Sequence, residues 1–129
     1  MDNCLFCKII RGEIPSYTIY EDEIAKAFMD INPVTNGHSL IIPKKHYDNI
    51  YDIEPDELLH MQKVARILMK EYKEKLGAEG FTLVQNNELG QEVKHYHLHI
   101  MPRYQGDQLR TESNQSQIKP VEEVFELLK

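Results

Sequence analysis

The sequence has no apolar run long enough to suggest a membrane-spanning helix. Such a helix needs roughly 20 predominantly apolar residues in a row, and no stretch of the 129-residue chain approaches this. The first residues, MDNCLFCKIIRGE, are also too polar for a secretory signal peptide. We therefore expect no membrane partner and predict a cytoplasmic protein, in a compartment where thiols stay reduced.

Basic side chains are in the minority. The chain has 15 Lys and Arg against 21 Asp and Glu, so its formal net charge is −6. This charge is not typical of proteins that bind nucleic acid over a broad surface, and we expect no nucleic-acid partner. Any anionic ligand must therefore be held by a local site.

Cysteine is scarce, and both copies lie near the start of the chain. Cys4 and Cys7 form a C-x-x-C pattern. In a reducing compartment this spacing is typical of half of a metal site or of a redox pair, more often than of a structural disulfide. Two inert core thiols are a third interpretation. A structural zinc site would need two further ligands.

The apolar pattern predicts a single α+β domain, which suits the length of the chain. The strongest element is a helix over 55–76, with Pro55 at its first position and Gly77 after its end. Short helices are expected over 4–11 and after Pro120. Alternating patterns joined by short turns predict antiparallel strands over 17–20, 23–30, 38–42 and 81–86, and from 95 onward. We expect a five-stranded antiparallel sheet with one long helix and short terminal helices.

The polar stretch after residue 104 marks the predicted boundary between the domain and a C-terminal tail. Residues 1–104 should form the domain, and 105–129 a C-terminal tail whose short helix packs on the same domain. Five strands and one large helix cannot easily cover both faces of a sheet. An exposed apolar surface or edge would therefore favour a dimer.

Three of the six histidines stand at every second position of HYHLHIM, residues 95–101. The alternation predicts a strand with histidines on one face and apolar residues on the other. The histidine row has three competing interpretations. It could be an ordinary polar face that contains histidine by chance, a binding site for one shared metal ion, or a site of catalysis at phosphorus. On a straight strand the outer two would lie roughly 13–14 Å apart, which argues against one shared ion. Neutral imidazole is a good nucleophile near pH 7, so we favour covalent catalysis at a phosphorus centre.

The row His95-Tyr-His97-Leu-His99-Ile-Met resembles the signature of the histidine triad family. FCKIIRGEIPS, AFMDINPVTNGHSLIIPKKH and GQEVKHYHLHIMPR resemble segments of bacterial, Hint-like members, and together they cover about residues 4–104. The resemblance implies a five-stranded antiparallel sheet that continues across a homodimer. It also implies binding of purine nucleotides, with transfer or hydrolysis of nucleoside monophosphates.

The same resemblance implies roles for individual histidines. His97 would be the nucleophile that forms a nucleotidyl-histidine intermediate, and its second ring nitrogen must be held in one tautomer. His99 resembles the histidine that contacts the phosphate. His38 resembles the fourth histidine, which supports the triad.

The nucleotide site implied by the resemblance has a phosphate side and a nucleoside side. The phosphate side comprises Asn86, Gly90, Gln91 and Glu92. Backbone N–H groups of Gly90 and Gln91 would approach the phosphate. Glu92 stands where some members carry Ser or Thr, and because a carboxylate cannot donate to phosphate, its contact would come from the backbone.

On the nucleoside side the resemblance assigns base packing to Phe28 and the ribose hydroxyls to Asp30, since a carboxylate is a pure acceptor. The other walls of the base pocket would be Phe6, Ile9 and Ile31.

Bacterial members with this C-x-x-C also carry a Cys₂His₂ zinc site. The resemblance therefore implies one structural Zn²⁺ per chain, held by Cys4, Cys7, His46 and His95. His95 would then serve the metal rather than the reaction. His60, on the predicted long helix, is expected to have no chemical role.

We therefore predict a homodimeric nucleotide hydrolase or transferase that cleaves purine nucleoside 5′-phosphoramidates, or related mixed anhydrides of AMP or GMP, and needs no further cofactor. One alternative is a dinucleoside polyphosphate hydrolase, and another is a regulatory protein that binds nucleotides. The leaving group helps to distinguish the two hydrolase activities, because the additional phosphates of a dinucleoside polyphosphate need positively charged side chains nearby. The candidate cations near the triad are Lys44, Lys45, Lys94 and Arg103.

Overall fold

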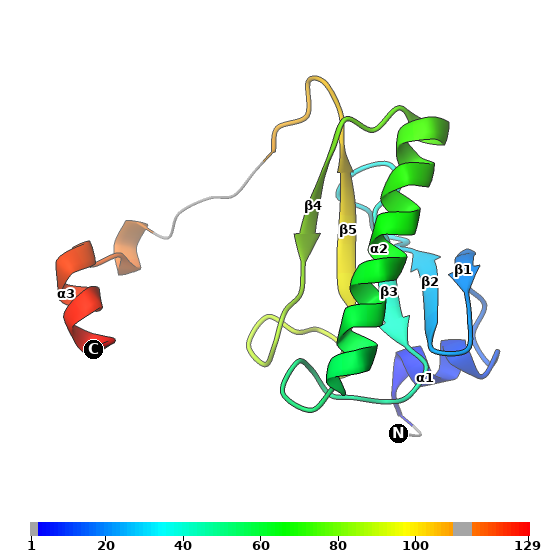
Figure 1. Ribbon diagram of the computed structural model, residues 1–129, viewed down its shortest axis with the longest axis horizontal. Coiled ribbons are helices and arrows are strands. Elements are labelled where there is room, and N and C mark those ends of the chain that lie inside the picture. The colour runs from blue at the N-terminus through cyan, green and yellow to red at the C-terminus, as the bar shows by residue number, and fades with distance from the viewer. Residues whose placement is uncertain (1–2, 110–114) are drawn as a thin grey trace.

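The computed structural model describes residues 3–109 and 115–129. One antiparallel sheet has the strand order β1-β2-β3-β5-β4, which confirms the predicted α+β architecture (Figure 1). The strands are β1 (Thr18–Glu21), β2 (Ala25–Met29), β3 (Ser39–Pro43), β4 (Gly80–Val84) and β5 (Leu98–Arg103).

The long helix α2 (Pro55–Leu76) has the bounds that the sequence predicts, and it crosses one face of the sheet (Figure 1). Pro55 suits the first turn because its missing N–H would have no partner there. Gly77 ends the helix in the left-handed conformation, with φ of 73°. The buried stripe of α2 is Met61, Val64, Ala65, Leu68 and Tyr72.

The opposite face of the sheet is covered in part by the short helix α1 (Leu5–Ile10). Phe6 and Ile9 of α1 pack with Phe28, Leu40 and Ile42 of the sheet. Side chains alternate along a strand, so the residues between these face α2 instead.

In β5 the apolar residues Leu98 and Ile100 belong to the core under α2. His97 and His99 alternate with them and line a cavity on the α1 side. The alternation seen in the sequence thus separates the core from the cavity.

The histidine strand is shorter than predicted. Ladder pairing of β5 with β3 runs from Ile41 opposite Leu98 to Ser39 opposite Ile100. Before Leu98 the chain pairs with a loop: the Tyr96 N–H donates to the Tyr47 carbonyl at 2.7 Å. His95 and His97 therefore precede the regular strand, and this irregular approach turns His95 toward the loop that follows β3.

The C-terminal tail contains a 3-10 turn (Gln115–Gln117) and the helix α3 (Val121–Leu127), which confirms the helix expected after Pro120. In the single chain α3 stands apart from the sheet (Figure 1). Its apolar residues Val121, Val124, Phe125 and Leu128 are all exposed. In the single chain, α3 therefore does not pack on the domain as we expected. The packing partner of its apolar surface stays a prediction.

No helix within the described residues has the length and apolar character that a bilayer crossing requires.

Candidate active site

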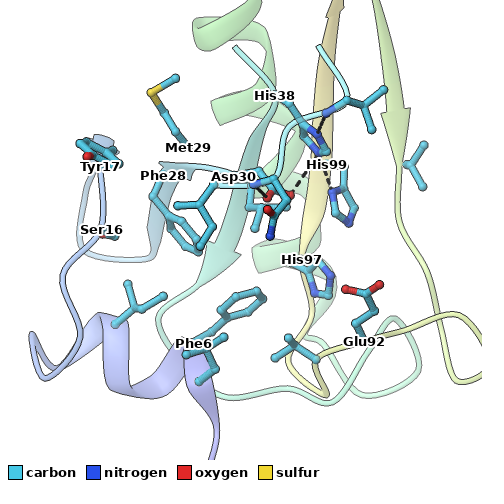
Figure 2. A pocket seen from close by; sticks show the side chains of 18 of the residues that line it. Phe6, Ser16, Tyr17, Phe28, Met29, Asp30, His38, Glu92, His97 and His99 are labelled. Atoms are coloured by element: carbon cyan, nitrogen blue, oxygen red, sulfur yellow. Dashed lines mark hydrogen bonds and ion pairs between the residues drawn. The ribbon is translucent and has the colours of Figure 1, made fainter. Parts of the chain in front are cut away.

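A cavity of about 900 Å³ opens on the α1 side of the sheet. Its walls come from α1, from β2 and the loop after it, from the loop before the histidine row, and from the row itself (Figure 2). Nearly all the residues that the sequence assigned to catalysis or to nucleotide binding line it: Phe6, Ile9, Phe28, Asp30, Ile31, His38, Asn86, Gly90, Glu92, His97 and His99. Gln91 is the exception.

The His97 ring is fixed in one tautomer. Its Nδ1 lies 2.7 Å from the His95 carbonyl oxygen. A carbonyl oxygen only accepts, so Nδ1 carries the proton and Nε2 keeps its lone pair. Burial lowers the pKa of His97 below its usual value, although the His95 carbonyl opposes the shift. The ring is therefore neutral near pH 7 and has the free nitrogen that a nucleophile needs.

His99 is fixed in the opposite tautomer through a relay. The Val34 N–H donates to His38 Nδ1 at 3.0 Å, so His38 carries its proton on Nε2. That Nε2 lies 2.9 Å from His99 Nδ1, which must accept, and His99 is left with its proton on Nε2. Burial, followed by the neighbouring His97 and His38, lowers the pKa of His99 to about 4. His99 is thus a neutral N–H donor beside the His97 ring, with ring centroids 5.0 Å apart.

Asp30 lies beside the middle of this relay, where His38 meets His99. Its Oδ2 is 3.6 Å from His38 Nε2, and its Oδ1 accepts the Asn32 N–H at 2.8 Å (Figure 2). The carboxylate faces the cavity and offers only acceptors, which suits ligand hydroxyl groups.

The apolar end of the cavity is built around two aromatic rings. Phe6 and Phe28 meet edge to face with centroids 5.5 Å apart, and Phe6 also meets the His97 ring edge to face at 5.1 Å. Ile31 is strongly exposed and lies at the rim. A flat heteroaromatic ring can pack against these apolar walls.

Gln91 does not have the phosphate-binding position that was expected from the sequence. Its backbone N–H donates to the Glu88 carbonyl at 2.9 Å, so it is not free for a phosphate. Its side chain accepts the Glu88 N–H at 3.1 Å and donates to the Asp48 carbonyl at 2.5 Å. Gln91 therefore braces the loop, while Gly90 and Glu92 on either side of it line the cavity.

The four predicted metal ligands come together beside the cavity. The ligand atoms of Cys4, Cys7, His46 and His95 all lie within 4.8 Å of one another. Cys4 Sγ is 3.4 Å from His95 Nδ1, and Cys7 Sγ is 3.3 Å from His46 Nδ1. Tetrahedral zinc bonds separate sulfur from nitrogen by about 3.6 Å, so the set fits a zinc ion.

The outer nitrogens of both histidine ligands are held by oxygen atoms. His95 Nε2 donates to the Pro43 carbonyl, and His46 Nε2 donates to Asp48 Oδ1, each at 2.9 Å. Both Nδ1 lone pairs therefore point into the cluster, which is the usual arrangement of metal-binding histidines. Sequence reasoning missed Asp48, although an acidic residue two positions after a predicted ligand was a usable signal. It also missed Val34, which acts through its backbone and leaves no signal in its side chain.

The remaining predicted residues lie outside the cavity. His60 donates from Nε2 to Asp22 Oδ2 at 2.7 Å and links α2 to the β1–β2 turn, a structural role. Arg103 is bound to Asp107 and Thr82. Lys44 pairs with Glu21 at 2.9 Å, and Lys45 lies 3.9 Å from Glu57.

A family model described as HIT domain matches residues 11–106. The chain belongs to the HIT domain family. The Bacillus subtilis protein named Protein hit is 50% identical over 109 residues, which are 80% of this chain and 72% of that protein. The family and the bacterial relationship that the sequence motifs predicted are therefore confirmed.

Two relatives carry names that give an activity. The adenosine 5′-monophosphoramidase HNT1 of Saccharomyces cerevisiae is 40% identical over 102 residues, 78% of this chain and 62% of that protein. The adenylylsulfatase HINT3 of Arabidopsis thaliana is 39% identical over 108 residues, 82% of this chain and 55% of that protein.

Among solved structures, a zinc-bound histidine triad family protein from Mycobacterium smegmatis is 36% identical to this HIT domain protein. The match has a TM-score of 0.81 and covers 88% of this chain and 84% of that one.

Proposed function

We propose that this protein is a nucleotide hydrolase or transferase that cleaves purine nucleoside 5′-phosphoramidates and related mixed anhydrides and releases the nucleoside monophosphate. One observation carries the proposal. His97 keeps a free Nε2 lone pair because its Nδ1 donates to the His95 carbonyl, and His99 presents an N–H donor next to it. A neutral nucleophile beside a neutral donor suits transfer of a nucleotidyl group that carries a single phosphate.

The reaction proceeds in two steps. The lone pair of His97 Nε2 attacks the α-phosphorus, the bond from phosphorus to the leaving nitrogen breaks, and the departing amine takes up a proton from solvent. The His99 N–H donates to a phosphate oxygen as charge develops there. Water then attacks the phosphorus, the bond to Nε2 breaks, and the water gives up a proton to solvent. The monophosphate leaves and His97 is neutral again.

The nucleoside is held at the other end of the cavity. The Phe6 and Phe28 rings pack against the purine, and the Asp30 carboxylate accepts hydrogen bonds from the ribose hydroxyls. These contacts place the α-phosphorus next to His97, and positioning of this kind can account for much of a rate enhancement.

A dinucleoside polyphosphate hydrolase is the weaker alternative. Its substrate adds further phosphates, which need positive charge. Among the described residues that line the cavity there is no Lys or Arg. The two relatives with named activities act on an adenosine phosphoramidate and on an adenylyl sulfate, neither of which adds a polyphosphate chain. A purely regulatory nucleotide-binding protein would have no need of the free Nε2 of His97.

Zinc is proposed as a structural ion, one per chain, on Cys4, Cys7, His46 and His95. A tetrahedral zinc with four protein ligands supplies rigidity and no open position for chemistry. His95 is at once a ligand and the source of the carbonyl that orients His97. The metal cluster would therefore hold the nucleophile in place without touching the substrate.

We further propose a homodimer in the cytosol. β4 lies at the edge of the sheet, with one side of its backbone unpaired in the single chain, and α3 exposes an apolar face. A second copy can continue the sheet at β4 and cover these apolar residues. The two thiols favour a reducing compartment if they bind metal. Light scattering that gives twice the chain mass would support the dimer, and the mass of a single chain would exclude it.

The test of the proposed function is to trap the intermediate. The protein is mixed with adenosine 5′-phosphoramidate, quenched in base within milliseconds and analysed by mass spectrometry. We expect one added AMP on the peptide that carries His97, and free AMP as the final product. Hydrolysis without an AMP-modified peptide in the wild type would rule the covalent mechanism out. The same modification in His97→Gln would show that His97 is not the nucleophile.

A further inference from the structure

The charges around the cavity are unusual for a site that handles phosphate. Two carboxylates line it, Asp30 and Glu92, and among the described lining residues no Lys or Arg balances them. Asp30 stands at the nucleoside end, next to His38. The side chain of Glu92 has no such assignment, because a carboxylate cannot donate a hydrogen bond to a phosphate.

The loop geometry determines where Glu92 lies. Gln91 is clamped by its side chain to the Asp48 carbonyl and to the Glu88 N–H, and so it faces away from the cavity. Its neighbour Glu92 faces inward and lines the cavity. In Figure 2 its carboxylate lies beside the His97 ring, on the side of that ring opposite to Phe28. The negative charge of Glu92 is close enough to act electrostatically on His97.

The Glu92 carboxylate lies where the leaving group of the substrate would extend, and not where the nucleoside would bind. The nucleoside lies toward Phe28 and Asp30, so the other substituent of the phosphorus extends away from them. Glu92 also lines a second hollow of about 400 Å³, in which Asp48 adds a carboxylate and Lys94 is the one Lys or Arg among the described lining residues. The region beyond the nucleophile is therefore acidic on balance.

We propose that Glu92 is a specificity-determining residue that makes the site prefer leaving groups with a positive charge, such as an amine bearing a second ammonium group, over neutral amines, and neutral amines over polyphosphates. The inference rests on the proposed function and adds the charge class of the substrate. A carboxylate attracts a cationic substituent and repels an anionic one by the same Coulomb interaction. Because Glu92 is exposed, salt should weaken both effects.

The experiment compares kcat/KM for three substrates in one low-salt buffer. They are the adenosine 5′-phosphoramidate of butylamine, that of 1,4-diaminobutane with its free ammonium group, and diadenosine tetraphosphate. For the wild type we expect the diamine compound to exceed the butylamine compound by about three- to tenfold, as one charge pair near the surface allows. In Glu92→Gln the ratio should fall to about one, and Glu92→Lys should reverse it and raise cleavage of the dinucleotide.

The matched control is Glu88→Gln, which makes the same charge change on the same loop at a residue that lines neither hollow. It should leave the ratio within about twofold of the wild type, since a charge farther off in solvent is screened. Raising the salt concentration should lower the wild-type ratio and leave that of Glu92→Gln unchanged.

The outcomes separate this inference from the proposed function. If the wild type forms the His97 intermediate and cleaves the phosphoramidates, but Glu92→Gln keeps the wild-type ratio, the role of Glu92 is wrong and the proposed function stands. If the wild type forms no nucleotidyl-histidine from any of the three substrates, both fail.

Discussion

Two clusters built around histidine lie on either side of His97, and they differ in what their lone pairs do. In the first, Cys4, Cys7, His46 and His95 direct four lone pairs at one point. In the second, Asp30, His38 and His99 also lie within 4.8 Å of one another, but His38 uses its N–H on His99. The first is therefore arranged as a metal site and the second as a chain of hydrogen bonds. In each histidine, the hydrogen-bond partner of one ring nitrogen determines whether the other nitrogen offers a lone pair or an N–H.

The largest expected effect comes from the residue between the clusters. His97→Ala should lower kcat for adenosine 5′-phosphoramidate by at least about a thousandfold, since no other described group offers a free lone pair at this point. AMP affinity should stay within about tenfold, because the base and ribose contacts remain. Steady-state kinetics and calorimetric titration with AMP measure the two. More than a tenth of wild-type activity would show that His97 is not the nucleophile.

The next effect concerns the metal cluster. Cys4→Ser should lose the one zinc per chain and lower the melting temperature by about 10 °C or more, because structural zinc contributes directly to folding free energy. Elemental analysis and thermal unfolding provide the readouts. Turnover should fall far less than in His97→Ala, since the carbonyl that orients His97 belongs to the backbone.

Wild-type protein prepared without chelators and free of metal would contradict the zinc assignment. A Cys4–Cys7 disulfide in the same sample would support the redox interpretation instead.

A smaller effect should follow from breaking the hydrogen-bond chain. His38→Asn removes the N–H that sets the tautomer of His99, and we expect kcat to fall by about 10- to 100-fold. The zinc content should not change, because His38 is not in the metal cluster. His60→Asn is the control, a histidine whose partner Asp22 lies outside the cavity. Equal kcat in the two variants would mean that the relay does not matter.

The smallest effect is on stability alone. Although burial opposes it, hydrogen bonds from Tyr20, His60 and two backbone N–H groups lower the pKa of Asp22. The folded pKa lies below the unfolded value of about 3.9, so the ionised carboxylate stabilises the fold above that pH and the benefit is lost as the pH falls. Asp22→Asn should cost about 1–2 kcal/mol at pH 7.

Urea unfolding of both proteins from pH 7 to pH 3 measures this difference. It should shrink as the pH drops below about 4. A constant difference over the whole range would mean that the charge of Asp22 does not contribute.

Much of this arrangement could be predicted from sequence because it depends on local patterns. The bounds of α2 follow from Pro55, Gly77 and the spacing of apolar residues between them. The four candidate metal ligands and the cavity residues follow from motifs that resemble those of the family. What could not be predicted depends on distant backbone groups.

Two residues show the limit. Gln91 faces away from the cavity because the Asp48 carbonyl, 43 residues earlier, accepts its side-chain N–H. β5 begins at Leu98 and not at the predicted residue 95, because the Tyr96 N–H donates to the carbonyl of Tyr47 and not to a neighbouring strand. Neither partner can be recognised from the order of residues alone.

The most direct test of the central claim is the tautomer of each histidine, read from long-range ¹⁵N–¹H correlation spectra of the labelled protein near pH 7. The claim predicts that His97 carries its proton on Nδ1, whereas His38 and His99 carry theirs on Nε2. His46 and His95 should also be protonated on Nε2, with Nδ1 shifts typical of a metal-bound nitrogen. If His97 is protonated on Nε2, or exchanges between both forms, its lone pair is not held for attack and the account fails.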